Sequence, residues 1–273
     1  MRMNLLRYRC LTFVAAMPLA CLSALHCNAG LVVQELFDGA ALDQSIGGQG
    51  ASLTSSLGFA SGSSWLTNGP EGLWTANNFN VDGSTLPGLA SNNGSQGGAY
   101  WAQWSVGNDW NTGIYATREL ASPIDFGLAQ TLYFSFSLRN ANDMSGGIGL
   151  ASGPNGSASF IGAGFTWDNA TSIGGSGNDA GNAAYIGHGT LDTNNGVYGI
   201  RANEAAGSVD GFGLLVGRLT FNASGNDVID IKRYAENSAI DNDLGTISWS
   251  ASSSLDSDMV ASHLVLWSNG GGG

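Results

Sequence analysis

Residues 131–139 read Thr-Leu-Tyr-Phe-Ser-Phe-Ser-Leu-Arg, with an apolar residue at every second position. Because successive side chains of a β-strand point to opposite faces, this spacing places Leu132, Phe134, Phe136 and Leu138 on one face of a half-buried strand. No long stretch after residue 29 keeps apolar residues at helical spacing. Similar short runs occur at 31–37, 99–106, 112–120, 157–167, 183–188, 197–201, 212–221, 227–234, 246–250 and 263–267. The alternation therefore predicts an all-β protein.

Turn-forming residues separate these runs. Asn-Gly pairs occur at 68–69, 93–94, 155–156 and 195–196, and Gly225-Asn226 lies between two of the clearest strands. Asn and Gly tolerate the positive φ that tight hairpin turns require. Many short strands joined by such turns predict a two-sheet antiparallel β-sandwich. Residues 39–98 are rich in Gly, Ser and Asn, and we expect long loops there, with short strands around Trp65, Trp74 and Phe79.

The first 29 residues have the pattern of an export signal. Three arginines precede a mostly apolar stretch at 10–25, and Cys27-Asn28-Ala29 offers a small-x-small cleavage site. This predicts a signal peptide at 1–29 and one sandwich domain at 30–273, secreted or held at the cell surface. A membrane anchor is the weaker alternative because Pro18 interrupts the stretch, and lipidation of Cys21 lacks the usual leucine three residues earlier.

Cysteine and charge restrict the chemistry of the mature chain. All three cysteines lie before residue 30, so the mature chain has no thiol for a disulfide or a thiolate metal site. The signal holds three of the nine basic residues and none of the 21 acidic ones, which leaves six against 21 and a formal net charge of −15. Such a charge disfavours nucleic acid and anionic membranes as partners and favours divalent cations. We also expect no membrane span in the mature chain.

Four segments resemble a known fold family. They are Glu35-Leu36-Phe37-Asp38, the strand at 132–139, the strand and turn at 219–227, and His263-Leu264-Val265-Leu266-Trp267. Together they resemble the concanavalin A-like lectin/glucanase sandwich, in the laminin-G-like form found in exported bacterial proteins with a PEP-CTERM sorting tail. The resemblance implies a jelly roll. Similar proteins continue beyond the position of Gly273 into one more strand and the tail, so we expect that last strand to be missing here.

The residues needed for hydrolysis are not arranged for it. Glycosidases of this fold class use paired carboxylates, and none of the five glutamates of the mature chain has another within reach on its strand. Asp227 and Asp230 are three apart, which excludes a same-face pair, and we expect them to be solvated turn residues. His188 and His263 have no adjacent nucleophile motif and are predicted to be packed or surface residues. The sequence therefore predicts a protein without catalytic residues.

Two kinds of binding residue stand out. Asp241 and Asp243 place alternating oxygen ligands in one loop and predict a calcium site, with an acidic turn as the alternative. Residues 178–179 and 256–258 are comparable candidates. Trp101, Trp104 and Trp110 form the densest aromatic group and predict a sugar-stacking surface, with core packing as the alternative.

Three functions compete on this basis. The first is a non-catalytic module that binds a polysaccharide or another cell-envelope polymer. The second is a structural matrix or surface protein without a small-molecule ligand. The third is a glycan hydrolase or lyase, which the missing carboxylate pair disfavours.

Overall fold

A computed structural model gives the fold of this chain. It describes residues 3–8, 30–35, 57–67, 74–77, 99–102, 114–139, 144–166, 183–191, 201–202, 212–235, 239–241, 243–249, 251–255 and 258–270. No helix in these ranges is long and apolar enough to cross a membrane.

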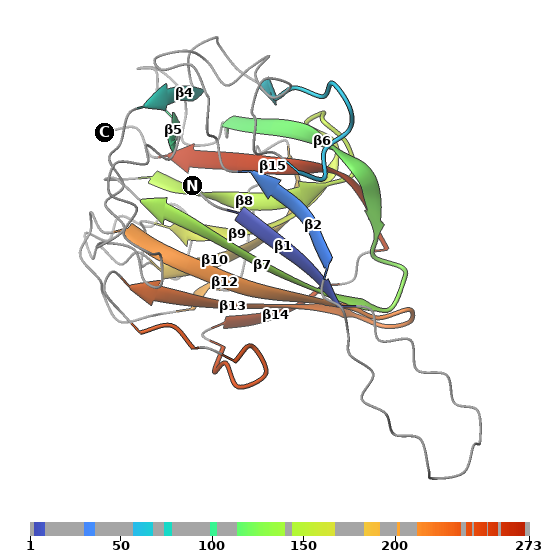
Figure 1. The fold of residues 1–273 in the computed structure, drawn as a ribbon, viewed down its shortest axis with the longest axis vertical. Helices are drawn as coiled ribbons and strands as arrows, with labels where there is room; N and C mark the ends of the chain where they lie inside the picture. Colours follow the sequence, from blue (N-terminus) through green and yellow to red (C-terminus); the bar gives the residue numbers. More distant parts are fainter. Residues whose placement is uncertain are drawn as a thin grey trace.

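The described chain is built from β-strands in two large antiparallel sheets and one hairpin (Figure 1). The six-stranded sheet has the order β14-β13-β12-β7-β1-β2, and the seven-stranded sheet has the order β11-β10-β9-β8-β15-β6-β3. Among the described strands, β4 and β5 pair only with each other. The strands are β1 Met3–Tyr8, β2 Gly30–Glu35, β3 Leu66–Thr67, β4 Trp74–Asn77, β5 Ala99–Ala102, β6 Ile114–Asp125, β7 Gln130–Arg139, β8 Met144–Ala151, β9 Ser159–Thr166, β10 Ala183–Thr190, β11 Arg201–Ala202, β12 Phe212–Phe221, β13 Asp227–Ala235, β14 Ala251–Leu255 and β15 Val260–Gly270.

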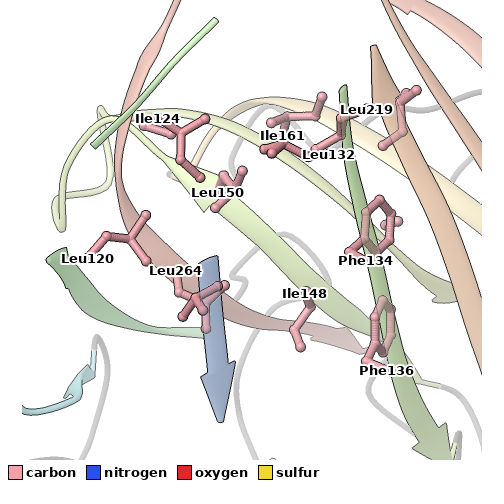
Figure 2. Close-up of a cluster of buried hydrophobic side chains, with 14 of the residues drawn as sticks. Leu120, Ile124, Leu132, Phe134, Phe136, Ile148, Leu150, Ile161, Leu219 and Leu264 are labelled. Atoms are coloured by element: carbon pink, nitrogen blue, oxygen red, sulfur yellow. The ribbon is translucent and has the colours of Figure 1, made fainter. Parts of the chain in front are cut away.

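The core lies between the two large sheets. Alternate residues of β7 and β12 on one sheet face alternate residues of β8, β9 and β15 on the other, as the close-up in Figure 2 shows. Leu132 and Phe136 of β7 are completely buried, and Phe134 is 6% exposed. The ring of Phe134 lies against Gly217 on the neighbouring strand, where a Cβ atom would overlap it. The strict alternation of residues 131–139 thus builds one wall of the sandwich interior.

Residues 57–67 connect the edge of one sheet to the other. The backbone of Ala121 donates to the carbonyl of Gly58, and that of Ala60 donates to the carbonyl of Glu119, so this segment is bonded to β6. Gly58 has φ +82° and lies directly on the Val32 carbonyl of β2, where a Cβ atom would overlap backbone. Trp65, which belongs to this segment, is completely buried. We call residues 57–67 the latch because they hold β2 against the seven-stranded sheet.

The prediction of an all-β, two-sheet antiparallel sandwich is confirmed. Gly225 has φ +93° in the β12–β13 hairpin, as its Gly-Asn pair predicted. Of the short strands expected around Trp65, Trp74 and Phe79, β3 begins directly after Trp65 and β4 begins at Trp74, while Phe79 lies outside the described residues. The strand predicted at 246–250 is wrong for the described residues 246–249, because Ile247 and Trp249 pack as an irregular segment over β12 and β13.

The sequence pattern did not predict three of the observed strands. Strand β8 reads Met-Ser-Gly-Gly-Ile-Gly-Leu-Ala, in which glycines hide the alternation of Ile148 and Leu150. Strand β14 is short and mostly serine. Strand β1 lies inside the segment predicted to be the export signal, between β2 and β7 in Figure 1. The boundary of the signal at Ala29 stays a prediction.

Candidate functional site

On the outer face of the seven-stranded sheet, many outward positions of three neighbouring strands are glycine. Ile148 and Leu150 point into the core, so their neighbours on β8 face outward, and the same alternation holds on β9 and β10. The register pairs these outward positions across the three strands. The resulting glycine face consists of Gly147, Gly149, Gly162, Gly164, Gly187 and Gly189. Gly147, Gly149, Gly162 and Gly164 are buried, whereas Gly189 at the end of the face is exposed.

Aromatic rings of the same sheet already use part of this face. A Cβ atom at Gly149 or Gly162 would overlap the ring of Phe160, and one at Gly162 would also come 3.1 Å from Trp267 Nε1. The Phe160 and Trp267 rings meet edge to face, with centroids 6.3 Å apart. Together with Tyr115 they are at most 8% exposed and form a cluster separate from the core. The Phe160 ring therefore lies over Gly149 and Gly162.

A row of register partners that includes two polar side chains crosses the end of the glycine face. Glu119 on β6 pairs in register with His263 on β15, which continues through Ala151 and Phe160 to Gly189 on β10. Glu119, Gly189 and Thr190 are exposed, so both ends of this row reach the surface. We call it the polar row.

The histidine of the polar row is held in one tautomer. Ser262 Oγ donates to the Ser152 carbonyl oxygen at 2.9 Å and lies 2.8 Å from His263 Nδ1. Because the hydroxyl proton is already donated, the contact to the ring requires a proton on Nδ1. Ser262 is therefore an acceptor from His263, which is the reverse of an activated nucleophile. Burial lowers the pKa of His263, and the opposite charge of Glu119 partly offsets this.

A buried hydroxyl lies on β6 two residues before Glu119, on the same face of the strand. Thr117 on β6 is completely buried and pairs with Val265 and Leu66. Its Oγ1 atom has no hydrogen-bond partner among the described residues. An unpaired buried hydroxyl costs free energy that a ligand or a water molecule would recover.

The outer face of the six-stranded sheet is filled by side chains of the chain itself. Arg218 on β12 donates from Nη2 to Asp230 Oδ2 at 2.7 Å and from Nε at 3.0 Å, and its guanidinium lies 5.1 Å from the ring centre of Trp249. Leu214, Val216, Tyr234, Ile240, Leu244, Ile247 and Trp249 form an apolar cluster on this face. We call the described residues of 239–249 the cover segment. It uses this face for packing.

The predicted calcium residues lie in the cover segment. Asp241 Oδ2 accepts from Lys232 Nζ and from the Tyr234 hydroxyl, each at 2.7 Å. Asp243 Oδ1 accepts from the Gly245 backbone N–H at 2.8 Å, which closes a turn. A cation at Asp241 would have to compete with the Lys232 ammonium group. No group of three metal-binding side chains gathers within the described ranges. The calcium site stays a prediction.

The predicted tryptophan group is placed only in part. Trp101 lies in β5, paired in register with Thr75 of β4, and its side chain is not described. Trp104 and Trp110 lie outside the described residues, so the structure does not bring the three together. The binding role of this group stays a prediction.

Two aspartates differ from the expectation made for them. Asp227 and Asp230 were expected to be solvated, but they are 3% and 5% exposed. Asp227 Oδ1 accepts from the Asn222 backbone N–H at 2.9 Å, and Asp230 binds Arg218. Both carboxylates therefore belong to internal hydrogen-bonding networks. The signal that sequence reasoning missed was Arg218, which lies opposite Asp230 in the β12–β13 hairpin.

Comparison with known proteins adds no relative. No protein-family model matches this chain, and no curated protein matches it.

Proposed function

We propose that this protein is an exported, non-catalytic binding module that holds a polysaccharide or another cell-envelope polymer along the outer face of its seven-stranded sheet. The observation that carries the proposal is the polar row, in which exposed Glu119 pairs in register with half-buried His263 and exposed Gly189 lies at the other end. The concanavalin A-like, laminin-G-like class inferred from the sequence is part of this proposal.

The chemistry of the face suits a hydroxyl-rich polymer. Glu119 is exposed and His263 is half-buried, and both can accept or donate hydrogen bonds to hydroxyl groups. The acidic net charge favours a neutral or cationic polymer over an anionic one.

The non-catalytic part is supported by where five of the described aspartates bind. Asp125 accepts from the Gly127 backbone N–H, and Asp227, Asp230, Asp241 and Asp243 likewise accept hydrogen bonds from their own fold. A general acid or base needs a carboxylate free to reach the scissile bond. Among the aspartates just named, each is already engaged in structure.

A glycan array, run on the purified protein with and without EDTA, tests the proposal. We expect binding to at least one polysaccharide, and we expect Glu119→Gln combined with His263→Asn to weaken it at least tenfold. Ser252→Ala, an exposed change on β14 of the other sheet, is the matched control and should bind like the parent protein. Trp101→Ala, Trp104→Ala and Trp110→Ala in the same assay test the predicted aromatic surface.

The alternatives give different results. A folded protein that binds no polymer under either condition would contradict the proposal and favour a structural role. Release of new reducing ends from a bound polysaccharide would contradict its non-catalytic part.

A further inference from the structure

Strand β1 fills an interior position of the six-stranded sheet. It pairs with β7 along one edge and with β2 along the other, and both pairings are antiparallel. Its residues lie in the segment predicted to be removed on export. Removal of that segment leaves β7 without a partner on one edge and separates β2 from its sheet.

We infer that the mature chain carries a strand-acceptor slot between β2 and β7, which takes an extended, apolar and basic peptide segment from a partner polypeptide. This site lies in the opposite sheet from the proposed polymer-binding face and does not depend on it. The inference rests on the predicted export signal.

The two strands cannot close the slot by moving together. Because β2 and β7 are each antiparallel to β1, they are parallel to each other, and direct pairing would need a shift of about one strand spacing, roughly 4.8 Å. Val33 of β2 is completely buried in the core. The latch holds the Val32 backbone through the close approach of Gly58 and is itself bonded to β6 of the other sheet. Moving β2 would break this packing.

The slot exposes both backbone and core. Strand β7 is bonded on its other side to β12 along its length, so one row of its N–H and C=O groups remains for an added strand. Leu132, Phe134 and Phe136 line the inner face of β7. In the register of the structure, the position opposite Phe134 is Leu5 and the position opposite Ser135 is Asn4. An added strand thus gains main-chain hydrogen bonds and covers apolar side chains, as in β-strand addition.

Charge favours a foreign basic segment over a second copy. The mature chain carries six basic and 21 acidic residues, so two copies repel each other. The residues that fill the slot in the full chain read Met-Asn-Leu-Leu-Arg-Tyr, which is apolar with one positive charge. A donor strand of this chemistry is attracted by the field of the acceptor.

Peptide binding to two forms of the protein tests the inference. The probe is a labelled, end-capped peptide with the sequence of residues 3–8, and the proteins are the full chain and residues 30–273. We expect saturable binding to residues 30–273, with a rise in its melting temperature, and at least tenfold weaker binding to the full chain, whose slot is filled. The same peptide with alternate backbone N–H groups methylated should lose at least tenfold in affinity, because it cannot complete the ladder. A peptide with Arg7→Glu should bind more weakly than the parent peptide.

Disulfide cross-linking tests whether the peptide binds beside β7 in the expected register. The mature chain has no cysteine, so Ser135→Cys introduces a single thiol. We expect it to form a disulfide with a peptide carrying Asn4→Cys, and we expect Ser252→Cys, on β14 of the same sheet, to form none.

Three results would overturn the inference. The first is a folded chain of residues 30–273 as stable as the full chain that neither binds nor cross-links the peptide. The second is a chain of residues 30–273 that fails to fold and whose β-sheet circular dichroism the peptide does not restore. The third is a dimer of residues 30–273 that excludes the peptide, which would assign the slot to a second copy. The first and third results leave glycan binding to the other sheet unaffected, so the glycan array distinguishes failure of this inference from failure of the proposed function.

Discussion

The outer faces of the two sheets carry opposite kinds of residue. The six-stranded sheet carries long side chains there, including Arg218 and Tyr234, and folds the cover segment over them. The seven-stranded sheet carries glycine at the corresponding positions of three strands and borders them with aromatic rings and the polar row. The first face contributes to stability through contacts within the chain. The second buries most of its glycines beside these rings but exposes Glu119 and Gly189 at the two ends of the polar row, and it is there that we place the binding function.

The largest effect should come from adding a side chain to the glycine face. Gly149→Val would place atoms on the ring of Phe160 and on the Ile161 carbonyl oxygen, so either the ring or the strand must move. We expect the free energy of unfolding to fall by about 3 kcal/mol, measured by urea denaturation. Gly153→Ala is the matched control, because its nearest neighbour would be 3.7 Å away, and it should change stability by less than about 0.5 kcal/mol. Equal effects of the two changes would show that the glycine face does not depend on close packing.

The next effect concerns the ion pair under the cover segment. Arg218→Met leaves the Asp230 carboxylate, whose side chain is 7% exposed, without its cationic partner. We expect a loss of about 2 kcal/mol, and we expect Arg218→Met with Asp230→Asn to recover part of it, since no charge is then left buried. Lys232→Met removes the more exposed pair with Asp241 and should cost less than about 1 kcal/mol. A double variant no more stable than Arg218→Met would contradict this account of the face.

A smaller effect should appear as a pH dependence from the polar row. The pKa of His263 is lowered in the folded protein by burial, so the unfolded chain binds a proton more readily. Stability due to this residue should therefore fall as pH drops through the ordinary histidine pKa and level off below the folded one. Thermal melts across this range should show a shallower slope for His263→Gln than for the parent protein. An unchanged slope would mean that His263 stays solvated in solution.

The smallest effect is spectroscopic and lies under the cover segment. Burial, together with the hydrogen bond to Asp241, raises the pKa of Tyr234 to about 12. Ultraviolet titration should find one tyrosine that ionises late, and Asp241→Asn should lower its pKa. Calcium bound at Asp241 and Asp243 would withdraw the carboxylate from the tyrosine and lower the same pKa, so titration with and without calcium checks the predicted metal site. A Tyr234 pKa unchanged in Asp241→Asn would contradict the hydrogen bond.

Much of the fold could be predicted because one face of each strand is buried. The alternation at 131–139 and 212–221 predicted β7 and β12 closely, since period-two spacing is what a half-buried strand requires. Strand β8 could not be found this way. Its outward positions are glycine, which is also the residue of turns, so its outer and inner faces do not differ as polar and apolar ones do.

The candidate site was less predictable. The sequence drew attention to clusters of adjacent residues, such as Asp241 with Asp243 and Trp101 with its neighbours. Glu119 and His263 are far apart in the chain and meet only because β6 and β15 pair. Asp230 was expected to be solvated because its partner Arg218 comes from another strand.

The sequence by itself determined the class of structure: alternating apolar residues, turn pairs and a cysteine-free mature chain predict a sandwich held together by its hydrophobic core. Only the tertiary structure decided which strands are neighbours. Pairing order brought six glycines together on one outer face, placed the cover segment over the other and set β1 between β2 and β7. The physical reason is that alternation states which face of a strand is buried, whereas the partner of each edge depends on contacts between residues distant in the chain.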